Sequence, residues 1–307
     1  MTQKHCILIG APVDCGKRRN GCLMGPDALR TAGIAQAITD LGHSVADLGN
    51  LTPKQVDIPD APPIHALAEN IGWTQTLMQT AQEAATKGMP IFMGGDHALA
   101  AGSVAGMAAH AHSENRPFFV LWLDAHSDIH TPQSSESGNL HGTPMGYVTG
   151  RRGFDGYPAL PAPVDPANVC MIGLRSVDAA EREVLTGGDV MLVDMRRIDE
   201  DGISGPLEIF LNRVKSANGM LHVSLDMDFL DPSIAPAVGT TVPGGATTRE
   251  GHLVMEILSD SGLVTSLDLV ELNPFLDERG KTAHLMVDLT ASLLGRRVFD
   301  RPTRSLK

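Results

Sequence analysis

The amino-acid sequence lacks several features that would assign it to common protein classes. Its four cysteines form no Cys-x-x-Cys pair, and the first residues include no apolar signal segment of useful length. No apolar run approaches the ~18 residues that a membrane helix requires. We therefore expect a soluble protein of the reducing cytoplasm with no membrane partner.

Two widespread motifs are also absent. No Gly-x-Gly-x-x-Gly follows the first predicted strand, which sets aside a dinucleotide enzyme, and there is no Gly-x-Ser-x-Gly nucleophile elbow. The formal net charge is −12 and Lys and Arg are dispersed, so nucleic acid is not expected as the main partner, whereas a cationic small molecule fits. No composition shift or linker divides the sequence, which predicts a single domain over residues 1–307.

Short, nearly continuous apolar segments recur along the chain. Such segments are typical of parallel strands that are buried on both faces of a sheet. Seven of them are clear, and Ser44 to Leu48 is a further candidate. The seven predicted strands are Cys6 to Ile9, Pro90 to Met93, Phe118 to Leu123, Val169 to Leu174, Val190 to Val193, Leu221 to Leu225 and Val264 to Val270.

Segments with apolar residues at helical spacing separate several of these strands. The predicted helices are Pro63 to Lys87, Ala98 to His112, Pro206 to Asn218, Thr248 to Ser261 and Lys281 to Leu294. Strands and helices that alternate in this way predict an α/β sheet with right-handed crossovers. In such sheets, ligands bind at the carboxyl ends of the strands.

Acidic residues and histidines follow three of the predicted strands. GGDH spans residues 94–97, LWLDAHSD spans 121–128 and VSLDMDFLDP spans 223–232. Side chains two residues apart in an extended segment point to the same face, so each acidic segment directs its carboxylates to one side. The candidate ligands are His97, Asp124, His126, Asp128, Asp226 and Asp228.

The number and type of these ligands predict a binuclear metal site. Four carboxylates and two imidazoles are too many for one ion and suit a bridged pair at about 3.5 to 4 Å. Four converging carboxylates without a cation would repel one another and become protonated. Oxygen donors outnumber nitrogen donors and no cysteine is near, which favours a harder ion such as Mn²⁺ over structural zinc and leaves Fe, Co and Ni open.

Five motifs in this order resemble the ureohydrolase family, and the arginases most closely: GGDH, DAHSDIH, SGNLHG, SLDMDFLDP and LDLVELNP. The resemblance extends from GAPVDCG near the start to ELNP at residues 271–274. It implies a three-layer αβα sandwich on an eight-stranded, mainly parallel sheet. It also implies the hydrolysis of L-arginine to L-ornithine and urea at two Mn²⁺ ions per chain, in a homotrimer or homohexamer.

The resemblance also implies roles for the six candidate ligands. Two cations acting on one bridging water lower its pKa and present a hydroxide to the guanidinium carbon, which is a poor electrophile. Asp128 could also accept a hydrogen bond from that hydroxide. By this likeness, His97 and Asp128 would bind one manganese ion, His126 and Asp228 the other, and Asp124 and Asp226 would bridge them.

Further residues would act on the substrate. His141 in SGNLHG resembles the family's proton-transfer histidine, because an imidazole titrates in the range needed to protonate the leaving amine. Glu271 in LVELNP would hold the planar guanidinium through a two-bond fork, although an isolated carboxylate more often caps or is solvated. Isolated loop histidines likewise most often have no role.

The remaining matches concern the amino acid head group of the substrate. Ser137 and Asn139 resemble the loop that takes the α-carboxylate. Asp178 and Glu181 match positions associated with the α-amino group, and a helix-start acid is the alternative for each. His130 stands where many arginases have an asparagine that helps hold the carboxylate, and an imidazole N–H can replace that donor. In addition, Ser176 replaces a carboxylate that is common at its position.

Two other functions stay open at this point. A related amidinohydrolase would act on agmatine, guanidinobutyrate or another guanidino compound, and the SGNLHG loop argues against it. A metal-binding or assembly protein would keep the ligands without turnover. His141 and Glu271 argue against that second alternative, because retention of metal requires neither residue.

Overall fold

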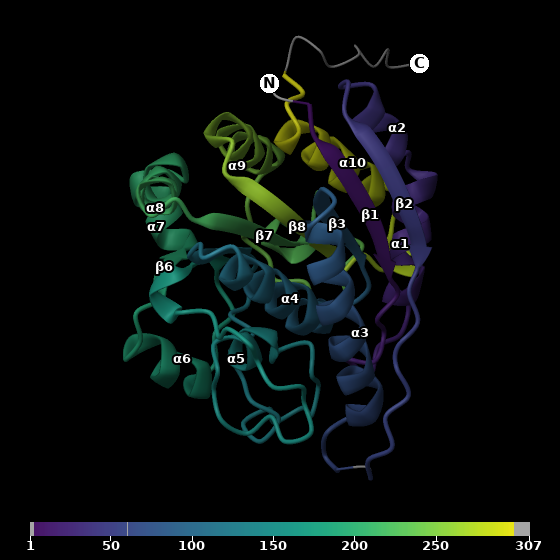
Figure 1. Ribbon diagram of the computed structural model, residues 1–307. Helices are drawn as coiled ribbons and strands as arrows, with labels where there is room; N and C mark the ends of the chain where they lie inside the picture. Colours follow the sequence, from purple (N-terminus) through teal and green to yellow (C-terminus); the bar gives the residue numbers. More distant parts are fainter. Residues whose placement is uncertain (1–2, 60, 298–307) are drawn as a thin grey trace.

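The computed structural model describes residues 3–59 and 61–297, which build a three-layer structure around one eight-stranded sheet (Figure 1). The strand order is β2-β1-β3-β8-β7-β4-β5-β6, and every strand pairs with its neighbours in parallel. The strands are β1 (His5–Ala11), β2 (Ser44–Asn50), β3 (Met89–Gly94), β4 (Phe118–Leu123), β5 (Val169–Leu174), β6 (Met191–Asp194), β7 (Met220–Asp226) and β8 (Val264–Val270).

Helices cover both faces of the sheet. In β1, Cys6 and Leu8 belong to one apolar core and Ile7 and Ile9 to a second, because successive side chains of a strand point to opposite faces. The first core is covered by α1 (Gly25–Thr31), α2 (Ile34–Thr39), α7 (Met195–Asp201), α8 (Ser204–Ser216), α9 (Thr248–Ser261) and α10 (Lys281–Leu293). The second is covered by α3 (Leu67–Ala85), α4 (Ala100–Ser113), α5 (Pro144–Val148) and α6 (Ala179–Thr186).

This architecture confirms the predicted αβα sandwich. All eight predicted strands are present, and the five predicted helices correspond to α3, α4, α8, α9 and α10. The range predicted for α9 coincides with the observed one, whereas α3 begins at Leu67, four residues later than predicted. The backbone of Ala66 is in the left-handed region, with φ at 49°, and a helix cannot continue through that conformation. The other five helices have eight residues or fewer, too short for a clear periodic pattern.

The order of the strands decides where the motifs meet. His97 follows β3, Glu271 follows β8, Asp226 and Asp228 lie at the end of β7, and Asp124 follows β4. These four strands are neighbours in the sheet and run in the same direction. Their carboxyl ends therefore lie along one edge, which brings together residues that are far apart in the sequence.

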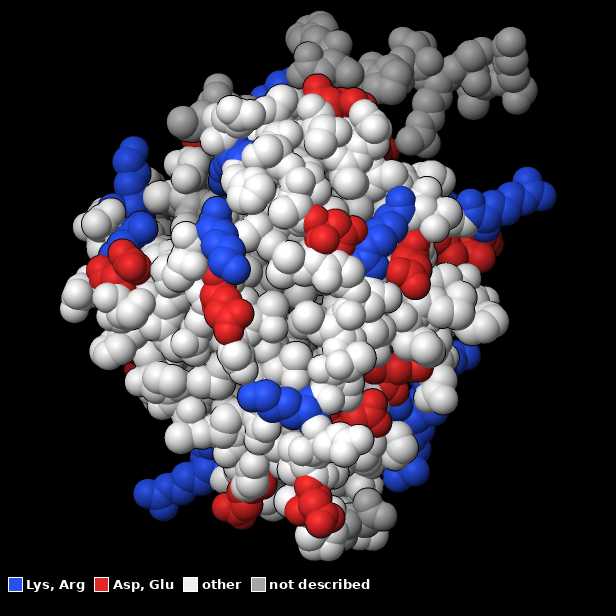
Figure 2. All heavy atoms as spheres, turned by 45° about the vertical axis from the view of Figure 1, so that its right-hand side comes forward, with Lys and Arg blue, Asp and Glu red and all other residues white. Residues whose placement is uncertain are grey.

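Two surface properties complete the description. No helix in the described ranges is both long and apolar enough to cross a lipid bilayer. On the face shown in Figure 2, acidic and basic side chains are interspersed.

Candidate active site

The first group of candidate ligands surrounds the ring of His97. Its Nδ1 atom lies 3.0 Å from Asp124 Oδ2, 3.0 Å from Asp226 Oδ2 and 3.2 Å from Asp128 Oδ2. All four side chains are buried. The backbone of Asp128 has a positive φ of 49°, and its carbonyl accepts hydrogen bonds from the first amides of α5. Packing of α5 thus holds Asp128 in a conformation that L residues rarely adopt.

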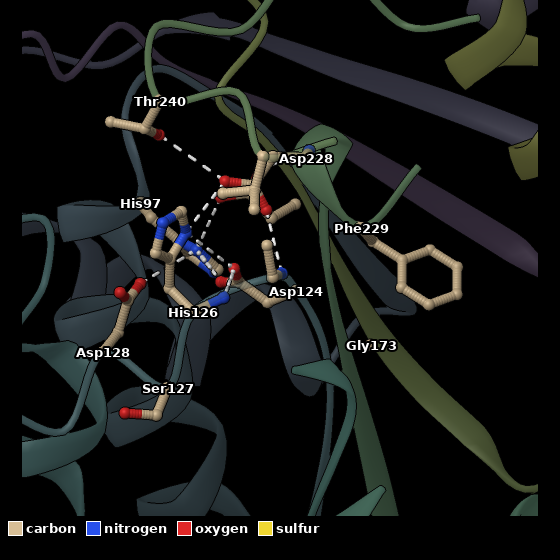
Figure 3. A network of polar contacts seen from close by, with 12 residues as sticks. His97, Asp124, His126, Ser127, Asp128, Gly173, Asp228, Phe229 and Thr240 are labelled. Atoms are coloured by element: carbon tan, nitrogen blue, oxygen red, sulfur yellow. Dashed lines mark hydrogen bonds and ion pairs between the residues drawn. The ribbon is translucent and has the colours of Figure 1, made fainter. Parts of the chain in front are cut away.

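The second group is built around His126 and shares Asp124 with the first (Figure 3). The Nδ1 atom of His126 lies 3.0 Å from Asp228 Oδ2 and 3.4 Å from Asp124 Oδ1. Asp124 therefore directs one carboxylate oxygen toward each histidine, which is the geometry a bridging ligand requires. The Oδ1 atom of Asp226 accepts the backbone N–H of Asp228 at 2.8 Å, and its Oδ2 atom faces His97.

The donor set of these two groups fits divalent cations. His97 Nδ1 and Asp124 Oδ2 are buried and have no hydrogen-bond partner among the described residues, although they lie 3.0 Å apart. Burial and the neighbouring carboxylates raise the pKa of Asp226 well above its ordinary value, and that of Asp228 to about 6. Burial favours the neutral ring of His126, yet the two facing carboxylates raise its pKa to about 12. Cations between these groups would favour the ionised carboxylates.

A polar chain behind His97 orients its ring. The indole of Trp122 stacks on the imidazole at a centroid distance of 4.0 Å and an interplanar angle of 1°. The Nε2 atom lies 2.9 Å from Ser224 Oγ, and Ser224 and Ser103 both donate to the carboxylate of Asp268, at 3.4 and 2.8 Å. Such outer partners direct the other ring nitrogen toward a metal. Sequence analysis missed all four residues, because an apolar strand or helix gives no sign of which polar side chain will face which neighbour.

Glu271 and His141 lie next to the first group. The Oε1 atom of Glu271 accepts the backbone N–H of His97 at 2.9 Å and lies 3.3 Å from His141 Nδ1. Its Oε2 atom forms an ion pair with Lys17, a residue that the sequence analysis did not identify. Burial would raise the pKa of Glu271, but the Lys17 ammonium and His141 hold it well below its usual range. The only sign of Lys17 in the sequence is its place in the glycine-bounded segment GKRRNG.

A pocket of about 280 Å³ opens beside these groups. In it, His130 Nε2 lies 2.8 Å from Asp178 Oδ2, and Ser127 Oγ donates to Glu181 Oε1 at 2.6 Å. Asp178 and Glu181 also form the capping box of α6. Both residues therefore line the pocket, as predicted, and also cap the start of a helix, which was the alternative prediction. The pocket lining combines candidate ligands with candidate substrate contacts: His126, Asp128, Asp226, His130, Ser137, Asn139, His141, Asp178 and Glu181.

The all-parallel αβα sheet carries two histidine–carboxylate groups of metal-ligand type at its carboxyl edge, beside a polar pocket. Comparisons with known proteins identify the family. The model of the arginase family matches residues 4–295, and this chain belongs to that family. It is 61% identical over 305 residues to an arginase of Brucella melitensis biotype 1, which covers 98% of this chain and 99% of the relative.

Two further relatives agree. An arginase of Agrobacterium fabrum is 57% identical over 304 residues, which covers 98% of this chain and 94% of that protein. The native structure of arginase from Bacillus caldovelox at pH 5.6 superposes with a TM-score of 0.88 at 35% identity. It covers 96% of this chain and 100% of that one. The resemblance inferred from the motifs is thus confirmed, and the chain is a hydrolase of the arginase type.

Proposed function

We propose that this protein hydrolyses the guanidino group of L-arginine to give L-ornithine and urea, with two Mn²⁺ ions as cofactors. The observation that supports this most is the composition of one pocket. Asp128 and Asp226, from the candidate metal groups, line it together with Ser137 and Asn139 from the SGN loop. A substrate with a reactive group at one end and an amino acid head group at the other would match both parts.

The buried carboxylates and imidazoles would hold the metal ions. When bound, a pair of divalent cations lowers the pKa of a shared water and so supplies a nucleophile at neutral pH. The oxygen-rich, cysteine-free donor set supports manganese over a thiolate-preferring metal. By likeness to the family, we assign His97 and Asp128 to one ion, His126 and Asp228 to the other, and Asp124 and Asp226 to both. In the described structure, His97, Asp124 and Asp226 form one group of possible ligands, and Asp124, His126 and Asp228 form another.

The head group of arginine would bind at the outer end of the pocket. The Asp178 and Glu181 carboxylates supply negative charge for the α-ammonium group, and Glu181 is buried. Ser137 and Asn139 supply polar groups for the α-carboxylate, whereas His130 could do so only by giving up its contact with Asp178. Glu271 is buried behind the pocket, 3.3 Å from the lining residue His141, and would pair with the guanidinium through the fork geometry that carboxylates offer to planar cations.

His141 is suited to transfer a proton to the leaving amine. Burial favours its neutral ring, but the hydrogen bond and charge of Glu271 raise the pKa of His141 above its ordinary value. A raised pKa favours the protonated ring, which can donate its proton as the C–N bond breaks. Asp128, which also lines the pocket, would accept a hydrogen bond from the attacking water and orient it.

One observation supports an alternative substrate. The Nε2 atom of His130 is already 2.8 Å from Asp178, so this ring nitrogen is not free to hold a carboxylate. A guanidino compound without an α-carboxylate, such as agmatine, does not need that contact. From family likeness alone, we further propose a single catalytic domain over residues 1–307, a cytoplasmic location and a homotrimer or homohexamer.

A urea-release assay decides between these substrates. The protein is stripped of metal and loaded in turn with Mn²⁺, Co²⁺, Ni²⁺, Fe²⁺ and Zn²⁺, and L-arginine, agmatine and guanidinobutyrate are tested with each. The proposal expects the highest kcat/KM for L-arginine with Mn²⁺. Equal turnover of agmatine and arginine would reject the arginase assignment and leave a binuclear amidinohydrolase.

A further inference from the structure

The ammonium group of Lys17 is buried against the carboxylate proposed to bind the substrate guanidinium. Lys17 is 2% exposed and Glu271 is fully buried, and they are 254 residues apart in the sequence. Lysine side chains are almost never buried to this degree unless they are paired. Lys17 thus places one positive charge where the substrate would bring another.

The position of Lys17 is fixed by its neighbours. The N–H of Gly16 donates to Asp96 Oδ2 at 2.8 Å, and the carbonyl of Gly16 accepts the backbone N–H of His141 at 3.0 Å. On the other side, a Cβ atom added to Gly239 would lie 3.2 Å from Lys17 Nζ. The ammonium therefore lies between the residues flanking His97 and the loop that carries Thr240, a residue that lines the substrate pocket.

Both oxygens of the Glu271 carboxylate already have partners. Oε1 receives the backbone N–H of His97 and lies 3.3 Å from the ring of His141. Oε2 is paired with Lys17, and Cys22 Sγ lies 3.8 Å from the same atom. A guanidinium fork requires two parallel N–H···O bonds. It cannot form at Glu271 while the Lys17 ammonium holds Oε2, so a cation that binds there must displace it.

We propose that Lys17 is a specificity-determining residue: its ammonium is a built-in competitor that occupies Glu271 until the guanidinium of the substrate replaces it. The inference rests on the proposed function, because it concerns the same site. It implies that the site binds the substrate guanidinium more weakly than it would if Glu271 had no ion pair with Lys17. Binding of the amino acid head group, in contrast, does not depend on Lys17. The alternative is a purely structural counter-ion that stabilises a buried carboxylate.

Two substitutions have opposite expected effects under these alternatives. Lys17→Gln frees Glu271, and since hydrogen bonds to charged groups contribute about 1.5–3 kcal/mol, the KM for L-arginine should fall about tenfold. Lys17→Arg places a guanidinium on Glu271 permanently, and this better-matched fork should raise KM at least about tenfold. A structural counter-ion predicts the reverse, with Lys17→Arg close to the wild type and Lys17→Gln impaired.

The experiment measures KM and kcat for urea release with the Mn²⁺-loaded protein, and the inhibition constant of L-norvaline. Norvaline has the amino acid head group but no distal cation, so its inhibition constant should not change. The control variant is Lys87→Gln, which alters the net charge equally at an exposed position before β3, away from the pocket. The proposal is overturned if the KM of Lys17→Gln for L-arginine is unchanged or higher. It is also overturned if the inhibition constant of L-norvaline changes by the same factor as that KM.

Thermal stability and binding give independent measurements. Lys17→Gln leaves a buried carboxylate unpaired, so L-arginine should raise its Tm more than that of the wild type. If the wild type releases urea from no guanidino compound, the proposed function fails. Calorimetric Kd values of L-arginine for the wild type and for Lys17→Gln still decide the role of Lys17. Equal Kd values for the two proteins, or no binding by either, overturn the proposal that Lys17 competes with the guanidinium.

Discussion

Replacing Glu271 with glutamine should lower both the stability of the fold and the rate of catalysis. The stability falls because Lys17 loses its partner, and the rate falls because the substrate guanidinium loses a carboxylate. The substitution keeps the size of the side chain and an oxygen that can accept the N–H of His97, at present 2.9 Å away. It removes the charge that neutralises Lys17, which is 2% exposed. Breaking a buried ion pair by removing one partner costs about 3–5 kcal/mol, because the other charge is left unpaired. The Tm of the metal-loaded protein should therefore fall by at least about 5 °C.

Catalysis should fall as well. Glu271 would no longer offer two anionic oxygens to the substrate guanidinium, and hydrogen bonds to charged groups contribute about 1.5–3 kcal/mol each. We expect kcat/KM for L-arginine to fall at least about tenfold. The metal content, measured by elemental analysis, should not change, because the Glu271 side chain is not among the two groups assigned to the metal ions.

A double variant separates the loss of the ion pair from other effects. In Lys17→Met/Glu271→Gln neither charge remains, so we expect this protein to melt above the Glu271→Gln variant. Glu278→Gln, an exposed substitution in the same segment, is the matched control. Calorimetric or circular-dichroism melting and urea-release kinetics are the assays. The reasoning is refuted if Glu271→Gln keeps the wild-type Tm and kcat/KM. It is also refuted if the loss of Tm in the double variant equals the sum of the losses in Lys17→Met and Glu271→Gln.

Three other predictions concern different parts of the molecule. Chelation should abolish activity and lower Tm, Mn²⁺ should restore both, and Asp226→Ala should retain less metal by elemental analysis; full activity of a metal-free preparation would contradict this. Asn139→Ala should reduce the preference for arginine over agmatine by weakening arginine alone, and an equal loss for both substrates would argue against a carboxylate contact. Hydrogen bonds from Ser233, Gly244 and Gly245 lower the pKa of Asp231 to about 2. Because the folded-state value is depressed, this stabilisation is present above about pH 4 and is lost as the pH falls toward 2. Denaturant melts of wild type and Asp231→Asn should therefore differ at neutral pH and converge in acid; a constant difference would exclude this origin.

Much of the fold follows from local patterns in the sequence. The segment FFVLWL of β4 is apolar at every position and buried at every position, so its pattern alone predicts a strand inside a parallel sheet. Helix α9 shows a capping box formed by Thr247 and Glu250 and a left-handed Gly262 after its end, and both signals can be read from the sequence. The short α1, α2, α5, α6 and α7 have too few turns for a clear apolar periodicity, although α6 has a capping box of its own, and they depend on packing against the sheet.

The candidate metal groups are an intermediate case. The spacing of Asp124, His126 and Asp128 predicts ligands at a strand exit, because local chain geometry controls which side chains share a face. That Asp124 directs one oxygen to each histidine depends on the order β3-β8-β7-β4 in the sheet. Strand order results from crossovers and packing among distant segments, and no local pattern encodes it.

The sequence by itself therefore determined the class of fold, the types of donor atoms and, through its motifs, the family. The tertiary structure alone decided which groups are paired inside the site. Lys17 and Glu271 lie on segments 254 residues apart and become partners only because β1 and β8 both lie beside β3, which directs their loops to one edge. Likewise, His130 faces Asp178 across 48 residues. A buried charge must find its partner through space, and that pairing depends on the whole arrangement of the chain.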